Sequence, residues 1–188
     1  MSKKAVVFVA PGFEEIEAVT IIDVLRRADI LTVVVGVDND KTNIVQGAHG
    51  IGIEIDAPIE EMEITGVDIA ICPGGMPGSV HLADSEGVRD YLNGVYKNGG
   101  IAAAICAAPI VLDAAGLLKN RAYTCYPGME DEIVLGTFTG KAVEVDGRVI
   151  TGSGPGTAMK FALKLVEELQ LKEKAQEVQK GMLYGTPL

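Results

Sequence analysis

The chain contains, at residues 99–109, the run Gly99-Gly100-Ile101-Ala102-Ala103-Ala104-Ile105-Cys106-Ala107-Ala108-Pro109. A glycine pair opens an apolar segment of strand length, and a helical pattern begins after Cys106 without an intervening polar loop. A strand that passes so abruptly into a helix requires a sharp turn, which pushes a side chain out of the sheet. The sequence therefore predicts Cys106 at a strand-to-helix turn.

Three similar runs of strand length precede this one, at Ala5–Ala10, Leu31–Val37 and Val67–Cys72. The segments between them are long enough to hold helices, and this alternation is typical of βαβ units. Because the runs are apolar throughout, they suit strands that are covered on both faces. We therefore expect an α/β fold with a doubly wound, mostly parallel sheet sandwiched by helices, in one domain over residues 1–188.

Other patterns complete this outline. Apolar residues recur at helical spacing over residues 14–28, and residues 43–56 have the alternation of an appended hairpin. Asp146-Gly147, between residues 141–145 and 148–151, is a strong signal for a second hairpin. Two helical patterns, over residues 156–169 and 171–182, close the chain.

Composition and charge exclude several classes of protein. The 188 residues are 48% hydrophobic and 22% charged, which is typical of a globular protein. The net charge of −10 disfavours nucleic acid and anionic lipid as partners. The longest nearly apolar stretch, 101–112, is shorter than the roughly 20 residues that cross a bilayer. Three distant cysteines make a poor disulfide framework, so we expect a reducing, cytoplasmic location.

The first candidate site residue is Cys106. Backbone amides and the dipole of the following helix would stabilise its thiolate and lower its pKa. A buried structural cysteine is equally consistent with the spacing.

Two further candidates follow other strands of the predicted sheet. Gly74 and Gly75, after the 67–72 strand, either supply amides to a substrate oxygen or only form a turn. Glu17 shares a helical stripe with Ile21, so it is expected to face inward, and a buried carboxyl keeps its proton to unusually high pH.

Cofactor motifs are weak or missing in the sequence. Residues 152–157, Gly-Ser-Gly-Pro-Gly-Thr, match a nucleotide-binding loop poorly, because Thr157 stands where the dinucleotide fingerprint has a third Gly or Ala. His49 and His81 are distant, and no Cys or His pair has the spacing of zinc ligands. Cys125 and Tyr126 precede a predicted Pro-Gly turn, and the pattern is as consistent with packing residues as with site residues. We expect no metal and no cofactor.

Taken together, four motifs resemble the ThiJ/PfpI superfamily, and most closely its Parkinsonism-associated deglycase branch. They are Glu14-Glu15-Ile16-Glu17, Cys72-Pro73-Gly74-Gly75, residues 103–109 around Cys106, and Gly154-Pro155-Gly156-Thr157. The resemblance implies a flavodoxin-like sandwich and a homodimer. It also implies that Cys106 is the nucleophile, that Glu17 is its protonated partner, and that Gly75 and Ala107 supply amides to the pocket.

The chain departs from this family pattern at two positions. Tyr126 stands where many members of the branch carry a histidine, which argues against a Cys-His hydrolytic dyad. His49 stands where the branch commonly has an arginine near the pocket and the dimer contact.

The resemblance implies a cofactor-independent cysteine enzyme that acts on small reactive carbonyls or their protein adducts. Its reaction would be of the glyoxalase III or deglycase type, such as methylglyoxal to lactate, with an oxidation-sensitive thiol. The alternative is a non-enzymatic redox-sensing or chaperone-like stress protein, in which oxidation of Cys106 alters partner binding. A cysteine amidase or protease is the least favoured interpretation.

Overall fold

The structure, a computed structural model, describes residues 3–38 and 43–185. Within them, a seven-stranded sheet has the order β10-β11-β7-β6-β1-β2-β5, and the strands pair in parallel except for β10 with β11. The five central strands, β2-β1-β6-β7-β11, follow the 2-1-3-4-5 order of flavodoxin-like folds. The bounds of the sheet strands are β1 (Lys4–Val9), β2 (Leu31–Gly36), β5 (Ala57–Pro58), β6 (Ile69–Cys72), β7 (Ile101–Ile105), β10 (Val143–Asp146) and β11 (Val149–Gly152).

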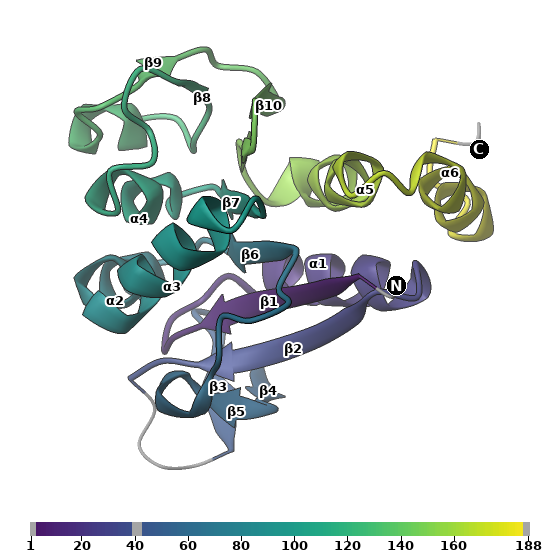
Figure 1. Cartoon of the computed structure of the whole chain (residues 1–188), viewed down its shortest axis with the longest axis horizontal. Coiled ribbons are helices and arrows are strands. Elements are labelled where there is room, and N and C mark those ends of the chain that lie inside the picture. The colour runs from purple at the N-terminus through teal and green to yellow at the C-terminus, as the bar shows by residue number, and fades with distance from the viewer. Residues whose placement is uncertain (1–2, 39–42, 186–188) are drawn as a thin grey trace.

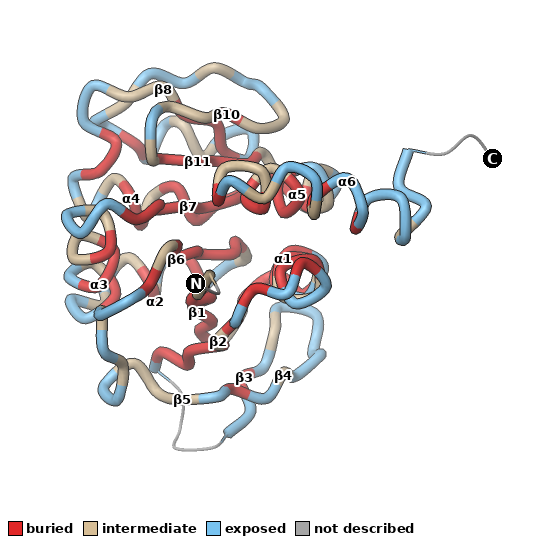
Figure 2. The backbone as a smooth tube through the Cα atoms, turned by 45° about the vertical axis from the view of Figure 1, so that its right-hand side comes forward, coloured by how far each residue is buried: buried red, intermediate tan, exposed pale blue. Residues whose placement is uncertain are grey.

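Helices cover both faces of the sheet (Figure 1). One apolar core lies against α2 (Gly78–Asp84), α3 (Glu86–Lys97) and α4 (Pro109–Ala114). The core on the opposite face lies against α1 (Glu15–Arg27), α5 (Ala158–Glu168) and α6 (Lys172–Gly181). Figure 2 shows the buried strands running between these two layers. The predicted doubly wound, flavodoxin-like sandwich is confirmed.

Both predicted hairpins form. Strands β3 (Ile44–Gln46) and β4 (Gly52–Glu54) pair antiparallel as the appended hairpin, outside the main sheet. The Asp146-Gly147 hairpin instead belongs to the main sheet, because its second strand, β11, pairs in parallel with β7.

Shorter elements were not predicted from the sequence. They are the two-residue strand β5, the pair β8 (Ala122–Tyr123) and β9 (Thr137–Phe138), and the 3-10 helices η1 (Ile59–Glu61), η2 (Met129–Glu132) and η3 (Pro155–Thr157). No helix among the described residues is long and apolar enough to cross a membrane.

The topology places one edge of the sheet in a special position. Strands β1 and β6 are neighbours, and the chain winds in opposite directions on either side of them. In open α/β sheets, ligands bind outside the carboxyl ends of the strands at such a switch point. The segments after β1, β6 and β7 carry Glu17, Gly74–Gly75 and Cys106, so the fold brings the predicted site residues to this edge.

Candidate active site

Cys106 occupies a sharp turn between β7 and α4. Its φ of 65° is in the left-handed region, which residues other than glycine rarely adopt. Its N–H donates to the Gly152 carbonyl at 2.9 Å, and its carbonyl accepts from the Tyr126 N–H at 2.8 Å. These bonds on both sides hold the backbone in the strained conformation, which is typical of a nucleophile elbow.

Glu17 lies within the fold beside this turn. Its side chain is fully buried, and the Gly74 N–H donates to its Oε2 at 2.8 Å. Among the described residues, Glu17 Oε1 has no hydrogen-bond partner of standard geometry. The Cys106 thiol is nevertheless close enough to donate to the Glu17 carboxyl and lower its pKa. A Cβ added to Gly74 would lie 2.6 Å from the Cys106 Cβ and 2.7 Å from Glu17 Oε2. The absence of a side chain at Gly74 therefore lets the carboxyl and the thiol meet.

Burial perturbs both groups of this pair. It raises the pKa of Glu17 to about 7, although the Gly74 amide and the Cys106 thiol oppose the rise. Burial also raises the pKa of Cys106 to about 12, and the Glu17 carboxylate adds to this rise. The two groups titrate as a pair, because a charge on one disfavours a charge on the other.

The raised thiol pKa is opposite to the lowering that the sequence predicts. Helix α4 has only six residues, so its dipole is weak, while the Cys106 side chain is largely desolvated. Near neutral pH the resting pair is therefore a protonated thiol beside a carboxyl group whose pKa is raised toward that range. A thiolate forms when Glu17 takes up the thiol proton.

Two backbone amides act on the sulfur. Hydrogen bonds from Ala107 and Gly75 lower the pKa of Cys106, in opposition to its burial. Gly75 has a φ of 93°, and a Cβ added there would lie 2.3 Å from the Glu14 nitrogen, so the loop requires glycine at this position. Gly74 differs from the prediction: its N–H donates to Glu17 and is not available to a substrate oxygen.

Glu14 is a site residue for which the sequence predicts no role beyond its place in the motif Glu14-Glu15-Ile16-Glu17. It is the N-cap of α1, and its Oε2 accepts from the Glu17 N–H at 2.7 Å. The Glu14 N–H in turn donates to the Gly74 carbonyl at 2.9 Å. Glu14 thereby fixes the start of the helix that carries Glu17. Its position three residues before a buried Glu is the spacing of a capping interaction and was a usable signal.

His49 is bound to the other buried acid of this segment. Its N–H donates to Glu15 Oε1 at 2.6 Å, and its Nδ1 lies 2.7 Å from Glu15 Oε2. The hydrogen bond to Glu15 raises the pKa of His49, whereas the His49 bonds lower the pKa of Glu15 against the effect of burial. The imidazole is 71% exposed. The structure gives His49 no bond to Cys106.

One set of side chains has the composition of a metal site. Donor atoms of Glu14, Glu15 and His49 lie within 4.8 Å of one another, the one such group among residues 3–38 and 43–185. Its carboxylates already accept hydrogen bonds from His49 and from the Glu17 amide.

Tyr126 contacts the turn through its backbone. Besides the bond to the Cys106 carbonyl, its ring lies over Gly154, where an added Cβ would be 3.2 Å from the ring Cδ2. The side chain is half exposed.

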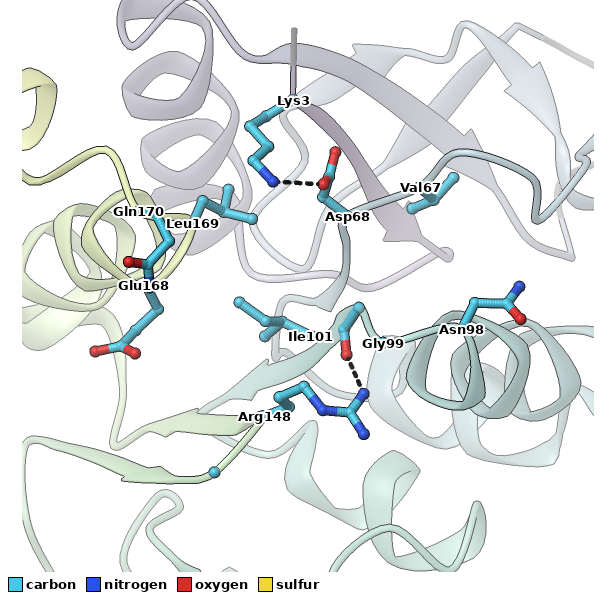
Figure 3. A pocket seen from close by; sticks show the side chains of 12 residues that line it. Lys3, Val67, Asp68, Asn98, Gly99, Ile101, Arg148, Glu168, Leu169 and Gln170 are labelled. Carbon is cyan, nitrogen blue, oxygen red and sulfur yellow. Dashed lines mark hydrogen bonds and ion pairs between the residues drawn. The ribbon is translucent and has the colours of Figure 1, made fainter. Parts of the chain in front are cut away.

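A hollow of about 540 Å³ lies at the opposite, amino edge of the strands (Figure 3). Its charged residues are engaged with the protein itself: Lys3 Nζ binds Asp68 Oδ1 at 2.8 Å, and Arg148 donates to the Gly100 carbonyl at 2.9 Å. None of the predicted site residues lines it, so it is separate from the Cys106 site.

Comparison with known proteins gives consistent matches. The sequence pattern of the DJ-1/PfpI family matches residues 3–168. Protein dj-1beta of Drosophila melanogaster is 42% identical over 97% of this chain and 98% of its own, and its crystal structure superimposes with a TM-score of 0.92 over the same shares.

Two other relatives cover nearly the whole chain. The glutathione-independent glyoxalase DJR-1.2 of Caenorhabditis elegans is 36% identical over 96% of both chains. The structure of Toxoplasma gondii DJ-1, described as oxidized, has a TM-score of 0.92 and 38% identity over 98% of this chain and 100% of its own. With a family match over most of its length and relatives above 30% identity, this chain belongs to the DJ-1/PfpI family.

Proposed function

We propose that the protein is a cofactor-independent cysteine enzyme that converts small 2-oxoaldehydes, such as methylglyoxal, to 2-hydroxy acids. The observation that carries this proposal is the buried pair of Glu17 and Cys106. In this pair a carboxyl with a pKa of about 7 lies beside the thiol of a residue whose backbone is strained. A carboxyl of this pKa is suited to accept and return protons at neutral pH. A relative that bears the name of a glutathione-independent glyoxalase supports the same reaction class.

The reaction begins when Glu17 takes the proton of Cys106 and the sulfur adds to the aldehyde carbon. The electron pair of the C=O bond moves to oxygen, and protonation gives a hemithioacetal. The amides of Gly75 and Ala107, which act on the sulfur, are the donors proposed for this oxyanion.

Glu17 then moves a proton between the two carbons. Glu17 is a carboxylate again once it has protonated the hemithioacetal oxygen. It then removes the hydrogen of the former aldehyde carbon as a proton, and an enediolate forms with the charge on the former ketone oxygen. Glu17 returns this proton to the former ketone carbon, and the hydroxyl proton of the former aldehyde carbon passes to the charged oxygen, which gives the thioester of the 2-hydroxy acid. Water hydrolyses the thioester, releases the acid and regenerates the thiol. The net reaction adds one water to methylglyoxal and consumes no cofactor.

The same geometry supports redox sensing as a second candidate function. Cys106 is 8% exposed, whereas Cys72 is 0% and Cys125 1% exposed, so an oxidant reaches Cys106 first. A related structure, from Toxoplasma gondii, is described as oxidized. Protease or amidase activity is less favoured, because His49 pairs with Glu15 and His81 lies 3.7 Å from Asp38, so neither serves as a base for Cys106.

Deglycation of protein adducts, a homodimeric assembly and a cytoplasmic location belong to the same proposal, as does a single domain over residues 1–188. The exposed apolar residues Ile16 and Val19, one turn apart on α1, support an interface.

Turnover separates the enzyme from the sensor. The test is lactate formation from methylglyoxal, without glutathione, by wild type and by Cys106→Ser. We expect many equivalents of lactate per chain from wild type and a background rate from Cys106→Ser. Equal rates in both proteins, or a single equivalent from wild type, would refute the enzyme.

A further inference from the structure

Two segments that are distant in sequence bind the backbone of Cys106, and one of them carries the half-exposed Tyr126. The Gly152 carbonyl, at the end of β11, accepts a hydrogen bond from the Cys106 N–H, and the Tyr126 N–H donates to the Cys106 carbonyl. Tyr126 is thus a direct backbone neighbour of the nucleophile, although 20 residues separate the two in sequence.

The backbone at Tyr126 is fixed on both sides. The Thr124 N–H donates to Thr151 Oγ1 at 2.8 Å, and the Thr124 hydroxyl donates to the Lys141 carbonyl at 2.6 Å. On the other side, the Tyr126 carbonyl accepts from the Met129 N–H at 2.9 Å. These hydrogen bonds fix the position of the Tyr126 backbone, from which the ring extends, beside the backbone of the nucleophile.

The ring itself packs on a glycine. Gly154 is buried, and an added Cβ would lie 3.2 Å from Cδ2 and 3.7 Å from Cε2 of Tyr126. A side chain at residue 154 would therefore compete with the ring for its place. Tyr126 as a whole nevertheless remains 50% exposed, so part of the residue is available to a ligand.

We propose that Tyr126, whose backbone binds that of Cys106 and whose ring is seated on Gly154, is a specificity-determining residue that favours 2-oxoaldehydes with an aromatic substituent over those with a methyl group. This inference rests on the proposed function. An aromatic substituent gains an offset-stacked or edge-to-face contact with the ring, and a methyl group does not. The chemical class follows from a half-exposed aromatic residue whose backbone binds that of the nucleophile.

The test uses alkylation of Cys106, which requires no turnover. Iodoacetamide and its N-phenyl derivative react by the same step: the sulfur displaces iodide and the thiol proton passes to Glu17 or to solvent. The ratio of their rates at Cys106, read by peptide mass spectrometry, measures the preference for the phenyl group of the reagent. A change in thiol reactivity affects both rates equally and leaves the ratio unchanged. We expect the ratio of phenyl to parent reagent to fall about 3- to 10-fold in Tyr126→Leu and to be retained in Tyr126→Phe.

Gly154→Ala provides a second variant that leaves Tyr126 in place. Its methyl group requires the ring to shift by a few tenths of an ångström, so the ratio is expected to fall in the same direction but by less than in Tyr126→Leu. Parallel turnover of phenylglyoxal and methylglyoxal separates the two proposals. A ratio that falls while wild type turns over neither aldehyde supports the aromatic contact and refutes the enzyme. An unchanged ratio in Tyr126→Leu overturns the role of Tyr126, whatever the turnover.

Discussion

Glu17 is a residue whose burial has a thermodynamic signature. Its pKa rises from 4.5 to about 7 on folding, so the folded state binds more protons than the unfolded state between these values. Stability from this group is complete below pH 4.5 and is lost as the pH rises through 7. Glutamine does not titrate, so Glu17→Gln does not lose this stability as the pH rises. The free energy of unfolding of the variant minus that of wild type should therefore increase by up to about 3 kcal/mol between pH 4 and pH 8.

Urea unfolding at several pH values measures this difference. Glu15→Gln is a matched control of opposite sign, because the pKa of Glu15 is lowered in the fold. Its stability relative to wild type should decrease as the pH rises. A Glu17→Gln difference that is constant with pH would show that the buried carboxyl is ionised at little cost.

Cys106 should be the most reactive thiol of the chain. Burial raises the pKa of all three cysteines, and both Cys106 and Cys125 lie beside a carboxyl group. Of the three, only Cys106 has backbone amides that lower its pKa, and it is the most exposed. Limiting iodoacetamide, followed by peptide mass spectrometry, should label Cys106 at least about 10-fold faster than Cys72 or Cys125. Preferential labelling of either other cysteine would remove Cys106 from the mechanism.

Some residue-level features could be predicted and others could not. The inward orientation of Glu17 followed from helical spacing, and the structure confirms it. The direction of the Cys106 pKa did not follow from the sequence, because the balance between burial and two amides depends on packing. The bond between the Gly74 amide and Glu17 joins residues 57 positions apart, and no local pattern encodes such a bond.

At the scale of elements, the turn from β7 to α4 contains stored backbone strain. A residue other than glycine in the left-handed region costs roughly 1–2 kcal/mol, and glycine has almost no such cost. Cys106 has a φ of 65°, so Cys106→Gly should be more stable than Cys106→Ala by about 1 kcal/mol.

The control for this comparison is Ala103→Gly, within the same strand and core as the turn. Glycine in an ordinary strand position should reduce stability by about 1 kcal/mol relative to alanine. Thermal or urea unfolding of the three variants and wild type gives the comparison. If Cys106→Ala proves as stable as Cys106→Gly, the turn is not strained.

The elements themselves differed in how well the sequence encoded them. Long apolar runs predicted the central strands, with bounds that differ by one or two residues from those observed, because burial on both faces requires such runs. The two-residue strands β5, β8 and β9 contain too few residues for any periodicity. The position of β11 beside β7 was also missed, since a hairpin signal fixes only the local pair and not its neighbour in the sheet.

At the scale of the whole molecule, the exposed apolar face of α1 predicts self-association. Ile16 is 59% and Val19 47% exposed, and the nearby hairpin turn exposes Ile51 to 58%. A glutamate in a buried apolar interface has no partner and disfavours it. Ile16→Glu should therefore convert a dimer at micromolar concentration to a monomer in sedimentation velocity.

Val134→Glu is the control, because Val134 is 82% exposed in a different part of the molecule. This variant should sediment as wild type does. A monomeric wild type, or equal association of both variants, would exclude the α1 face as the interface.

The proposed reaction requires the Glu17 carboxyl to move the proton that converts the aldehyde adduct to the acid. The most direct measurement is the rate of lactate formation by Glu17→Gln, per Cys106 counted with iodoacetamide, relative to wild type at the same pH. Glutamine retains the size and the amide contact of Glu17 but cannot transfer a proton between carbons. We expect a rate lower by about 100-fold or more, the usual loss when a general acid–base group is removed. A rate within a few-fold of wild type would contradict this role of Glu17.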